Sequence, residues 1–184
     1  MKPNPQGKGS LSLLRDLNGS THGIPILPKD AKEVLTELFT SLFVLRSDFK
    51  FRPVVGRSYW LYHVQERFKL YQFSPEEWGN RAPGRWVGCC ALGSDLTWSV
   101  EINPNLPEDS DLMTHIREQK QAWEEEVEKE DQMEDLLPEH LGDLPYHQRV
   151  MAYGLGKSLR ASLEMSGQLT LQPSKAQPNK LNSN

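Results

Sequence analysis

The chain has 184 residues, of which 37% are hydrophobic, and a formal net charge of −4, which fits one modest domain with polar extensions. It has no run of 18 apolar residues, and its N-terminal sequence lacks an apolar stretch of secretory length, so neither a membrane-spanning helix nor export is predicted. The adjacent cysteines Cys89 and Cys90 would point to opposite faces of a strand and are poor disulfide partners, so a reduced, cytoplasmic location is expected.

Composition divides the chain into four parts. Residues 1–27 are rich in Pro, Gly, Asn and Ser and are expected to form a flexible N-terminal arm. Residues 28–104 are predicted to form the core domain, which is built from a helix and a β-meander. Residues 105–167 are predicted to hold a long acidic helix and a C-terminal helix, and the polar residues 168–184 a disordered tail.

The first predicted element is a helix over residues 30–48. Asp30 follows Pro28 and is placed to cap it, and Arg52-Pro53 ends the helical pattern. Apolar residues recur at helical spacing, and Phe39 and Phe43 widen this stripe, so burial on more than one side is expected. The stripe consists of Ala31, Val34, Leu35, Leu38, Leu42, Leu45 and Phe49.

Nine of the sixteen aromatic residues lie between positions 59 and 98. Aromatic side chains bury the largest apolar area per residue, so the compact core is expected there. The segment is predicted to form an antiparallel meander with strands over residues 59–64, 68–73, 85–92 and 96–102.

One turn of helix is predicted between the second and third strands. Ser74 can act as its N-cap, Pro75 suits the first helical position, and Glu77 completes a capping box. The turn should carry Trp78 and end at Gly79.

The fourth strand alternates between apolar and polar side chains. Such alternation is typical of an antiparallel sheet that is covered on one face, and the 30–48 helix is the natural cover. The predicted class is therefore α+β, with a helix packed on a small antiparallel four-stranded meander and followed by two C-terminal helices. The residues predicted to face the helix are Leu96, Trp98, Val100 and Ile102, and those predicted to face water are Thr97, Ser99 and Glu101.

Residues 108–143 contain 14 acids and 3 bases, whereas the remainder of the chain contains 11 acids and 18 bases. A long helix with a thin apolar seam is predicted over residues 108–137. Two interpretations of its charge stay open: the acidic face is solvated, or it lies over a basic surface of this protein or of a partner.

The last helix is predicted over residues 146–166 and is ended by Gly167. Within it, Gly154-Leu155-Gly156-Lys157-Ser158 resembles part of a phosphate-binding loop. Met151 stands where that motif needs its first glycine, and no buried strand precedes it. We therefore expect these small residues to let another element pack closely.

No His, Cys or carboxylate spacing matches a catalytic or metal site. His140, Asp143 and His147 come nearest to a metal-binding cluster, and exposed hinge residues are the favoured interpretation. The glutamates of the acidic helix lack the burial that would suit them to acid–base work. No catalytic residue, metal or cofactor is predicted.

The aromatic block has two interpretations: its rings fill the core, or a subset lines a binding surface. Such surfaces bind peptides, cations or single-stranded nucleic acid. Basic residues are interleaved with the aromatic ones, so nucleic-acid binding stays open as an interpretation. The acidic character of the chain and the lack of an RNA-binding signature argue against that interpretation. The candidate binding residues are Trp60, Tyr62, Tyr71, Trp78, Arg81, Arg85 and Trp98.

The same block resembles a known protein family. The resemblance rests on Phe73-Ser74-Pro75-Glu76-Glu77-Trp78-Gly79 and Asp95-Leu96-Thr97-Trp98 at their spacing. These segments are similar to a domain-of-unknown-function family that has bacterial members and one uncharacterised animal member. The similarity covers about residues 30–102 and a short stretch at residues 4–9. Since that family has no established activity, the resemblance implies no catalytic residue.

The sequence favours a non-enzymatic, cytoplasmic binding or adaptor module with a protein partner and no membrane contact. One alternative is an RNA-binding or single-stranded-DNA-binding protein, which would present a contiguous basic face. The other is an enzyme of unknown type, which would have a deep pocket near His63, Glu76, Glu77 or the cysteines. The sequence leaves the oligomeric state open.

Overall fold

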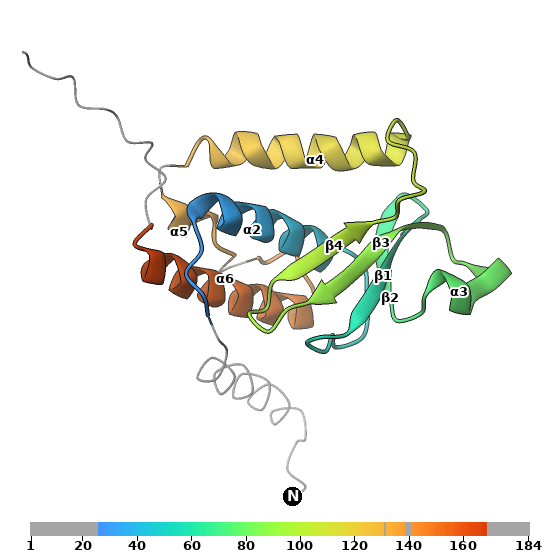
Figure 1. Ribbon diagram of the computed structural model, residues 1–184, viewed down its shortest axis with the longest axis horizontal. Helices are drawn as coiled ribbons and strands as arrows, with labels where there is room; N and C mark the ends of the chain where they lie inside the picture. The colour runs from blue at the N-terminus through green and yellow to red at the C-terminus, as the bar shows by residue number, and fades with distance from the viewer. Residues whose placement is uncertain (1–25, 131, 139–140, 169–184) are drawn as a thin grey trace, which may run out of the picture.

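The structure is a computed structural model that describes residues 26–130, 132–138 and 141–168. The predicted arm and tail lie almost wholly outside these ranges. Figure 1 shows a four-stranded sheet beside a layer of helices, with α2 between α4 and α6 in this view, so the predicted α+β class is confirmed. The elements are α2 (Ala31–Leu45), β1 (Ser58–Val64), β2 (Arg67–Tyr71), α3 (Pro75–Trp78), the 3-10 turn η2 (Gly79–Arg81), β3 (Arg85–Leu92), β4 (Trp98–Ile102), α4 (Asp111–Val127), α5 (Met133–Leu136) and α6 (Tyr146–Ser166).

Helix α2 begins as predicted and ends three residues early. The Asp30 carboxylate accepts a hydrogen bond from the Glu33 backbone N–H at 2.7 Å, which caps the first turn. Beyond Leu45 the chain turns to pair with β2, because the Asp48 N–H donates to the Phe68 carbonyl at 2.8 Å. That strand-like bridge replaces the last predicted turn of helix.

The sheet is antiparallel, with the strand order β2-β1-β3-β4. The order departs from a simple sequential meander at one place, since β3 pairs with β1 rather than with β2. The connection over residues 72–84, which contains α3, therefore passes the end of β1. The β1–β2 turn places Gln65 and Glu66 at φ 49° and 60°, as in the two-residue turns that match strand twist.

A β-bulge interrupts the pairing of β1 with β3. Leu61 lies opposite Gly88, but the next residue, Tyr62, lies opposite Trp86, so Val87 is the extra residue. Val87 is fully buried in the core cluster. The bulge thus places Val87 on the covered face and leaves Trp86 on the other face with Tyr62.

The core surrounds α2: it lies between α2 and one face of the sheet and continues between α2 and α6. From the sheet, Tyr59, Leu61 and Trp98 join the core cluster, together with Leu38 and Leu42 of α2. The predicted alternation of β4 is confirmed: Trp98 is 2% exposed, whereas Ser99 and Glu101 are exposed. Strand β4 begins at Trp98 because the preceding Leu96 has a φ of 68° and belongs to the turn.

The acidic segment forms a shorter helix than predicted. Residues 111–127 form α4 and Met133–Leu136 form the separate turn α5. The glutamates of α4 are exposed, and the described ion pair on α4 is internal, between Lys120 and Glu124. Among the described residues, this arrangement supports the solvated interpretation of the acidic face.

Helix α6 spans the predicted residues, and Gly167 ends it in the left-handed conformation with φ 70°. The segment that resembles a phosphate-binding loop lies inside this helix. A Cβ atom added at Gly156 would lie 3.4 Å from Pro138 Cδ, so this glycine allows a close approach, as expected. No helix of the described ranges combines the length and apolar character that crossing a membrane requires.

The two cysteines provide a test of the strand register. Cys90 is fully buried, and burial, followed by the charge of Cys89, raises the pKa of the Cys90 thiol to about 12; Cys89 is half-buried on the other face. We expect one thiol per native chain to react with a disulfide reagent at about pH 8, near the usual thiol pKa. Cys89→Ser should abolish that reaction and Cys90→Ser should leave it. Equal reactivity of both thiols in the native protein would contradict the register.

Candidate functional site

The sheet face turned away from α2 presents a row of aromatic side chains, here called the open face. The register places Trp60 of β1 between Tyr71 of β2 and Cys89 of β3. All three side chains are partly buried rather than sealed. Because α2 packs on the opposite face, Trp60 lies near the middle of a sheet surface that no described helix but α3 covers.

One end of the open face is closed by the short helix α3. Tyr62 is fully buried, and its ring contacts Tyr71 edge-on at 5.6 Å, while Tyr71 contacts Trp78 at 5.7 Å. The predicted capping box is confirmed: Ser74 N–H donates to Glu77 Oε2 at 2.7 Å, and Glu77 N–H donates to Ser74 Oγ at 3.2 Å. The box holds α3 so that Trp78 extends the aromatic row beside Tyr71 and Tyr62.

Carboxylates flank the aromatic row. Glu101 of β4 lies opposite Cys89 and is exposed. Burial, assisted by the charges of Glu76 and Glu77, raises the pKa of Tyr62 to about 12. Lys69, opposite Tyr62, brings a positive charge to this face. The open face is thus aromatic with mixed charge, and not a contiguous basic surface.

The structure brings together four of the seven predicted binding residues: Trp60, Tyr62, Tyr71 and Trp78. Arg81 is exposed at the end of η2, which directly follows α3. Arg85 lies opposite His63 and projects away from the Trp86 face, and Trp98 lies in the core. The aromatic block is therefore divided between core and surface, and each of the two interpretations applies to part of it.

The residues considered for catalysis or metal binding do not form a common site in the described part of the chain. The His63 ring packs against Phe68 at 5.4 Å, and His147 Nε2 lies 3.2 Å from the Phe49 carbonyl oxygen. His140 lies outside the described residues. Within the described ranges, no three His, Cys, Asp or Glu side chains gather as metal ligands do.

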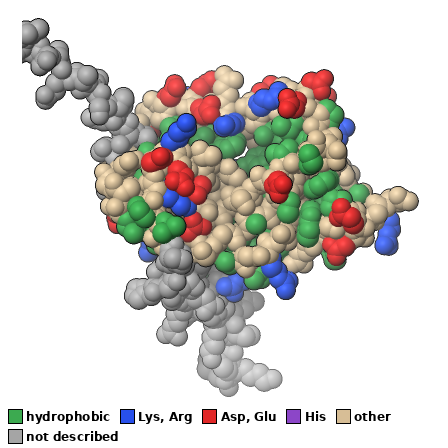
Figure 2. Space-filling view, viewed as in Figure 1, with side chains coloured by type: hydrophobic (Ala, Val, Ile, Leu, Met, Phe, Trp, Pro, Cys, Tyr) green, Lys and Arg blue, Asp and Glu red, His purple; other side chains and the backbone are tan. Residues whose placement is uncertain are grey.

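A cavity that the sequence did not indicate lies on the other side of the molecule. It has a volume of about 740 Å³ and is bounded by α2, β2, α4 and the start of α6. Figure 2 shows the molecule hollowed at this position, with hydrophobic side chains around the opening. None of the seven predicted binding residues lines it. Its residues come from four separated segments with no shared motif, so the sequence offered no signal for it.

Comparison with known proteins gives one match. The model of a family described as "Protein of unknown function (DUF2452)" matches residues 17–119, more than half of the chain. The match reaches further at both ends than the resemblance seen in residues 30–102. It ends within α4, at Gln119, which lines the cavity. Searches of curated proteins and of solved structures found no match.

Proposed function

Since this chain belongs to the DUF2452 family, whose description assigns no function, we propose its function from the geometry of the sheet: it is a non-enzymatic binding module that recognises a protein segment on the open face. The observation that carries the proposal is the position of Trp60. A partly exposed tryptophan with Tyr71 on one side and Cys89 on the other offers an apolar surface with a polar edge.

The charges around Trp60 favour a protein segment over nucleic acid. A phosphate backbone needs neutralising Lys and Arg side chains, whereas Glu101 and Glu76 stand exposed at this face and Arg85 projects to the other side. A segment with apolar and basic side chains would match this pattern, because aromatic faces attract cations and the carboxylates complement them.

Two further features support a binding role in the cytoplasm. His63 packs against an aromatic ring, and the Cys90 thiol, with a pKa raised to about 12 by burial, is not an active nucleophile. Both cysteines are free thiols, which is the usual state of cysteines in a reducing compartment.

The proposal can be tested by peptide selection on the purified full-length chain. Displayed random peptides should enrich sequences that combine apolar and basic residues, and a synthetic peptide of that kind should bind in solution. Trp60→Ala should weaken its binding at least about tenfold, as expected when a central aromatic contact of about 1.4 kcal/mol or more is lost. The matched control is Tyr153→Ala, which removes an exposed aromatic ring on α6 and should leave binding unchanged.

Two outcomes would refute the proposal. One is enrichment of peptides that bind Trp60→Ala as tightly as the original chain. The other is binding of single-stranded RNA or DNA at low salt that Trp60→Ala abolishes, which would favour the nucleic-acid alternative.

A further inference from the structure

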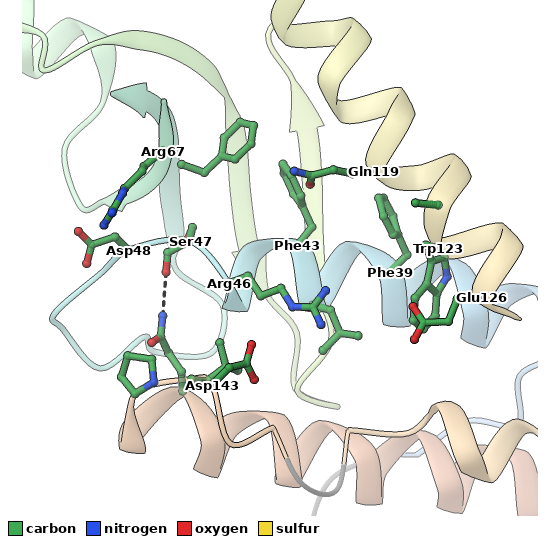
Figure 3. Close-up of a pocket in the computed structure, with 16 residues that line it drawn as sticks. Phe39, Phe43, Arg46, Ser47, Asp48, Arg67, Gln119, Trp123, Glu126 and Asp143 are labelled. Atoms are coloured by element: carbon green, nitrogen blue, oxygen red, sulfur yellow. Dashed lines mark hydrogen bonds between the residues drawn. The ribbon is translucent and has the colours of Figure 1, made fainter. Parts of the chain in front are cut away.

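The cavity beneath α4 has apolar walls made of aromatic rings from three elements. Phe39 and Phe43 of α2 are stacked with their centroids 6.3 Å apart, and Phe43 meets Phe68 of β2 edge-on at 4.8 Å. Trp123 of α4 faces them from the opposite side (Figure 3). A volume of about 740 Å³ lies within the range of small-molecule sites. These walls suit a flat or branched apolar group.

One wall of the cavity includes a buried amide, that of Gln148. Gln148 is 2% exposed, and its Nε2 donates to the Ser47 carbonyl oxygen at 2.8 Å. Its Oε1 is buried and accepts no hydrogen bond from the described residues. Because that oxygen is closed to solvent, the Gln148 amide fixes the wall of the cavity beside Ser47 and is not itself a contact for a ligand.

An exposed arginine, Arg46, lines the same cavity. Figure 3 shows the Arg46 side chain extending from the end of α2 toward the space in front of Trp123. Within the described part of the chain, no carboxylate lies at ion-pairing distance from the Arg46 guanidinium. An arginine in this state can bind a carboxylate through two parallel hydrogen bonds.

The remaining charges favour a ligand that also carries a positive group. Besides Arg46, the charged residues that line the cavity are Arg67, Asp48, Glu126 and Asp143, all exposed, so three carboxylates stand against two arginines. A simple anion would meet these carboxylates unfavourably. A ligand with an ammonium group would instead complement these carboxylates.

We infer that the cavity binds a zwitterion with an apolar body, namely a free α-amino acid or dipeptide with a large hydrophobic side chain. The carboxylate would bind Arg46, the ammonium group would face the carboxylates that line the cavity, and the side chain would lie among Phe39, Phe43 and Trp123. This site is separate from the open face, so the inference does not depend on the proposed peptide binding.

The test uses the full chain and four compounds. L-Phenylalanine and L-phenylalanyl-L-phenylalanine contain both charged groups, phenethylamine lacks the carboxylate, and 3-phenylpropionate lacks the amine. Saturation-transfer NMR should detect the two zwitterions, and titration calorimetry should show that each truncated compound binds at least about tenfold more weakly, because each lacks a charge-assisted hydrogen bond.

Two arginine variants locate the site. Arg46→Gln should weaken L-phenylalanine binding at least about tenfold and should make L-phenylalanine and phenethylamine bind alike, since the carboxylate then has no partner. The matched control is Arg149→Gln, which removes an exposed arginine next to Gln148 that stacks on Tyr146 and does not line the cavity. It should leave binding unchanged. Circular dichroism checks that both variants are folded.

Three results would overturn the inference. The first is no saturation transfer to any of the four compounds at millimolar concentration. The second is 3-phenylpropionate binding as tightly as L-phenylalanine, which would show that the amine is not recognised. The third is an equal loss of binding in Arg46→Gln and Arg149→Gln.

Discussion

Replacing Trp98 with alanine is expected to lower the free energy of unfolding by about 3–5 kcal/mol, the range for emptying a large aromatic site in a core. Trp98 is 2% exposed, and its ring meets Tyr59 edge-on at 5.8 Å. Its backbone N–H also donates to the buried Ser41 hydroxyl of α2 at 2.9 Å, so the residue joins β4 to the covering helix through side chain and backbone. Urea denaturation followed by far-ultraviolet circular dichroism measures the loss.

Trp60→Ala is the matched comparison, because it removes the same side chain from the opposite face of the same sheet. Trp60 is only partly buried, so we expect a loss of about 1 kcal/mol, well below that at Trp98. If the two variants lost equal stability, or if Trp60→Ala lost more, the assignment of covered and open faces would be wrong.

Local signals in the sequence predicted the elements well. The capping box of Ser74 and Glu77, the Asp30 cap and the Gly167 stop each depend on residues a few positions apart. Such interactions form within one or two turns of chain, so a pattern of neighbouring residues specifies them. This is why α2 begins, α3 lies and α6 ends where the sequence placed them.

Pairing between distant segments was less predictable. Nothing near β3 in the sequence shows that it joins β1 rather than β2, or that Val87 is an extra residue in that pairing. The bulge decides that Trp86 shares a face with Tyr62, since a shift of one residue turns every side chain to the other face. The division of the aromatic block between core and surface therefore required the structure.

The cavity was unpredictable for the same reason. Gln148 and the carbonyl oxygen that it binds, that of Ser47, are 101 positions apart. Arg46 is an ordinary residue at the end of a helix, and only the approach of α4 and α6 makes it part of the wall of a cavity. By contrast, the four open-face residues were found because a short range of the sequence concentrates them.

The segments that carry the family resemblance act as structural devices. Asp95 accepts hydrogen bonds from the Thr97 N–H and hydroxyl, and it also pairs with Lys29 at 2.7 Å. Burial alone would raise the pKa of Asp95, but the hydrogen bonds from Lys29 and Thr97 outweigh burial and lower that pKa below its usual value. This network fixes the turn that delivers Trp98 to the core. The Asp-Leu-Thr-Trp segment therefore has a structural explanation that requires no chemistry.

Replacing Trp78 with alanine is expected to cost about 2 kcal/mol, although Trp78 lies on a single turn of helix. The side chain is partly buried and meets Tyr71 at 5.7 Å and Phe73 at 5.5 Å. The loss of a partly buried aromatic side chain and of its two edge-on ring contacts accounts for this magnitude. Phe73→Ala is the control, since Phe73 is 52% exposed and its loss should cost no more than about half as much.

The same substitution should change the ionisation of Tyr62. Burial first, and then Glu76 and Glu77, raise the pKa of Tyr62 to about 12, so the native state holds the phenol proton more tightly than the unfolded state does. The stability that this proton provides is complete below a pH of about 10, the ordinary tyrosine pKa, and is lost as the pH rises toward 12. Without Trp78, water should reach Tyr62, and the pKa of Tyr62 should fall toward its ordinary value.

Tyrosinate absorbance titrations of the original chain and of Trp78→Ala, each compared with its Tyr62→Phe derivative, would isolate this one residue. A Trp78→Ala chain that kept its stability to within about half a kcal/mol and kept Tyr62 protonated as before would show that α3 does not cover the sheet. In that case Tyr62 would also belong to the open face. The surface available to a partner would then be larger than it is with α3 packed over Tyr62.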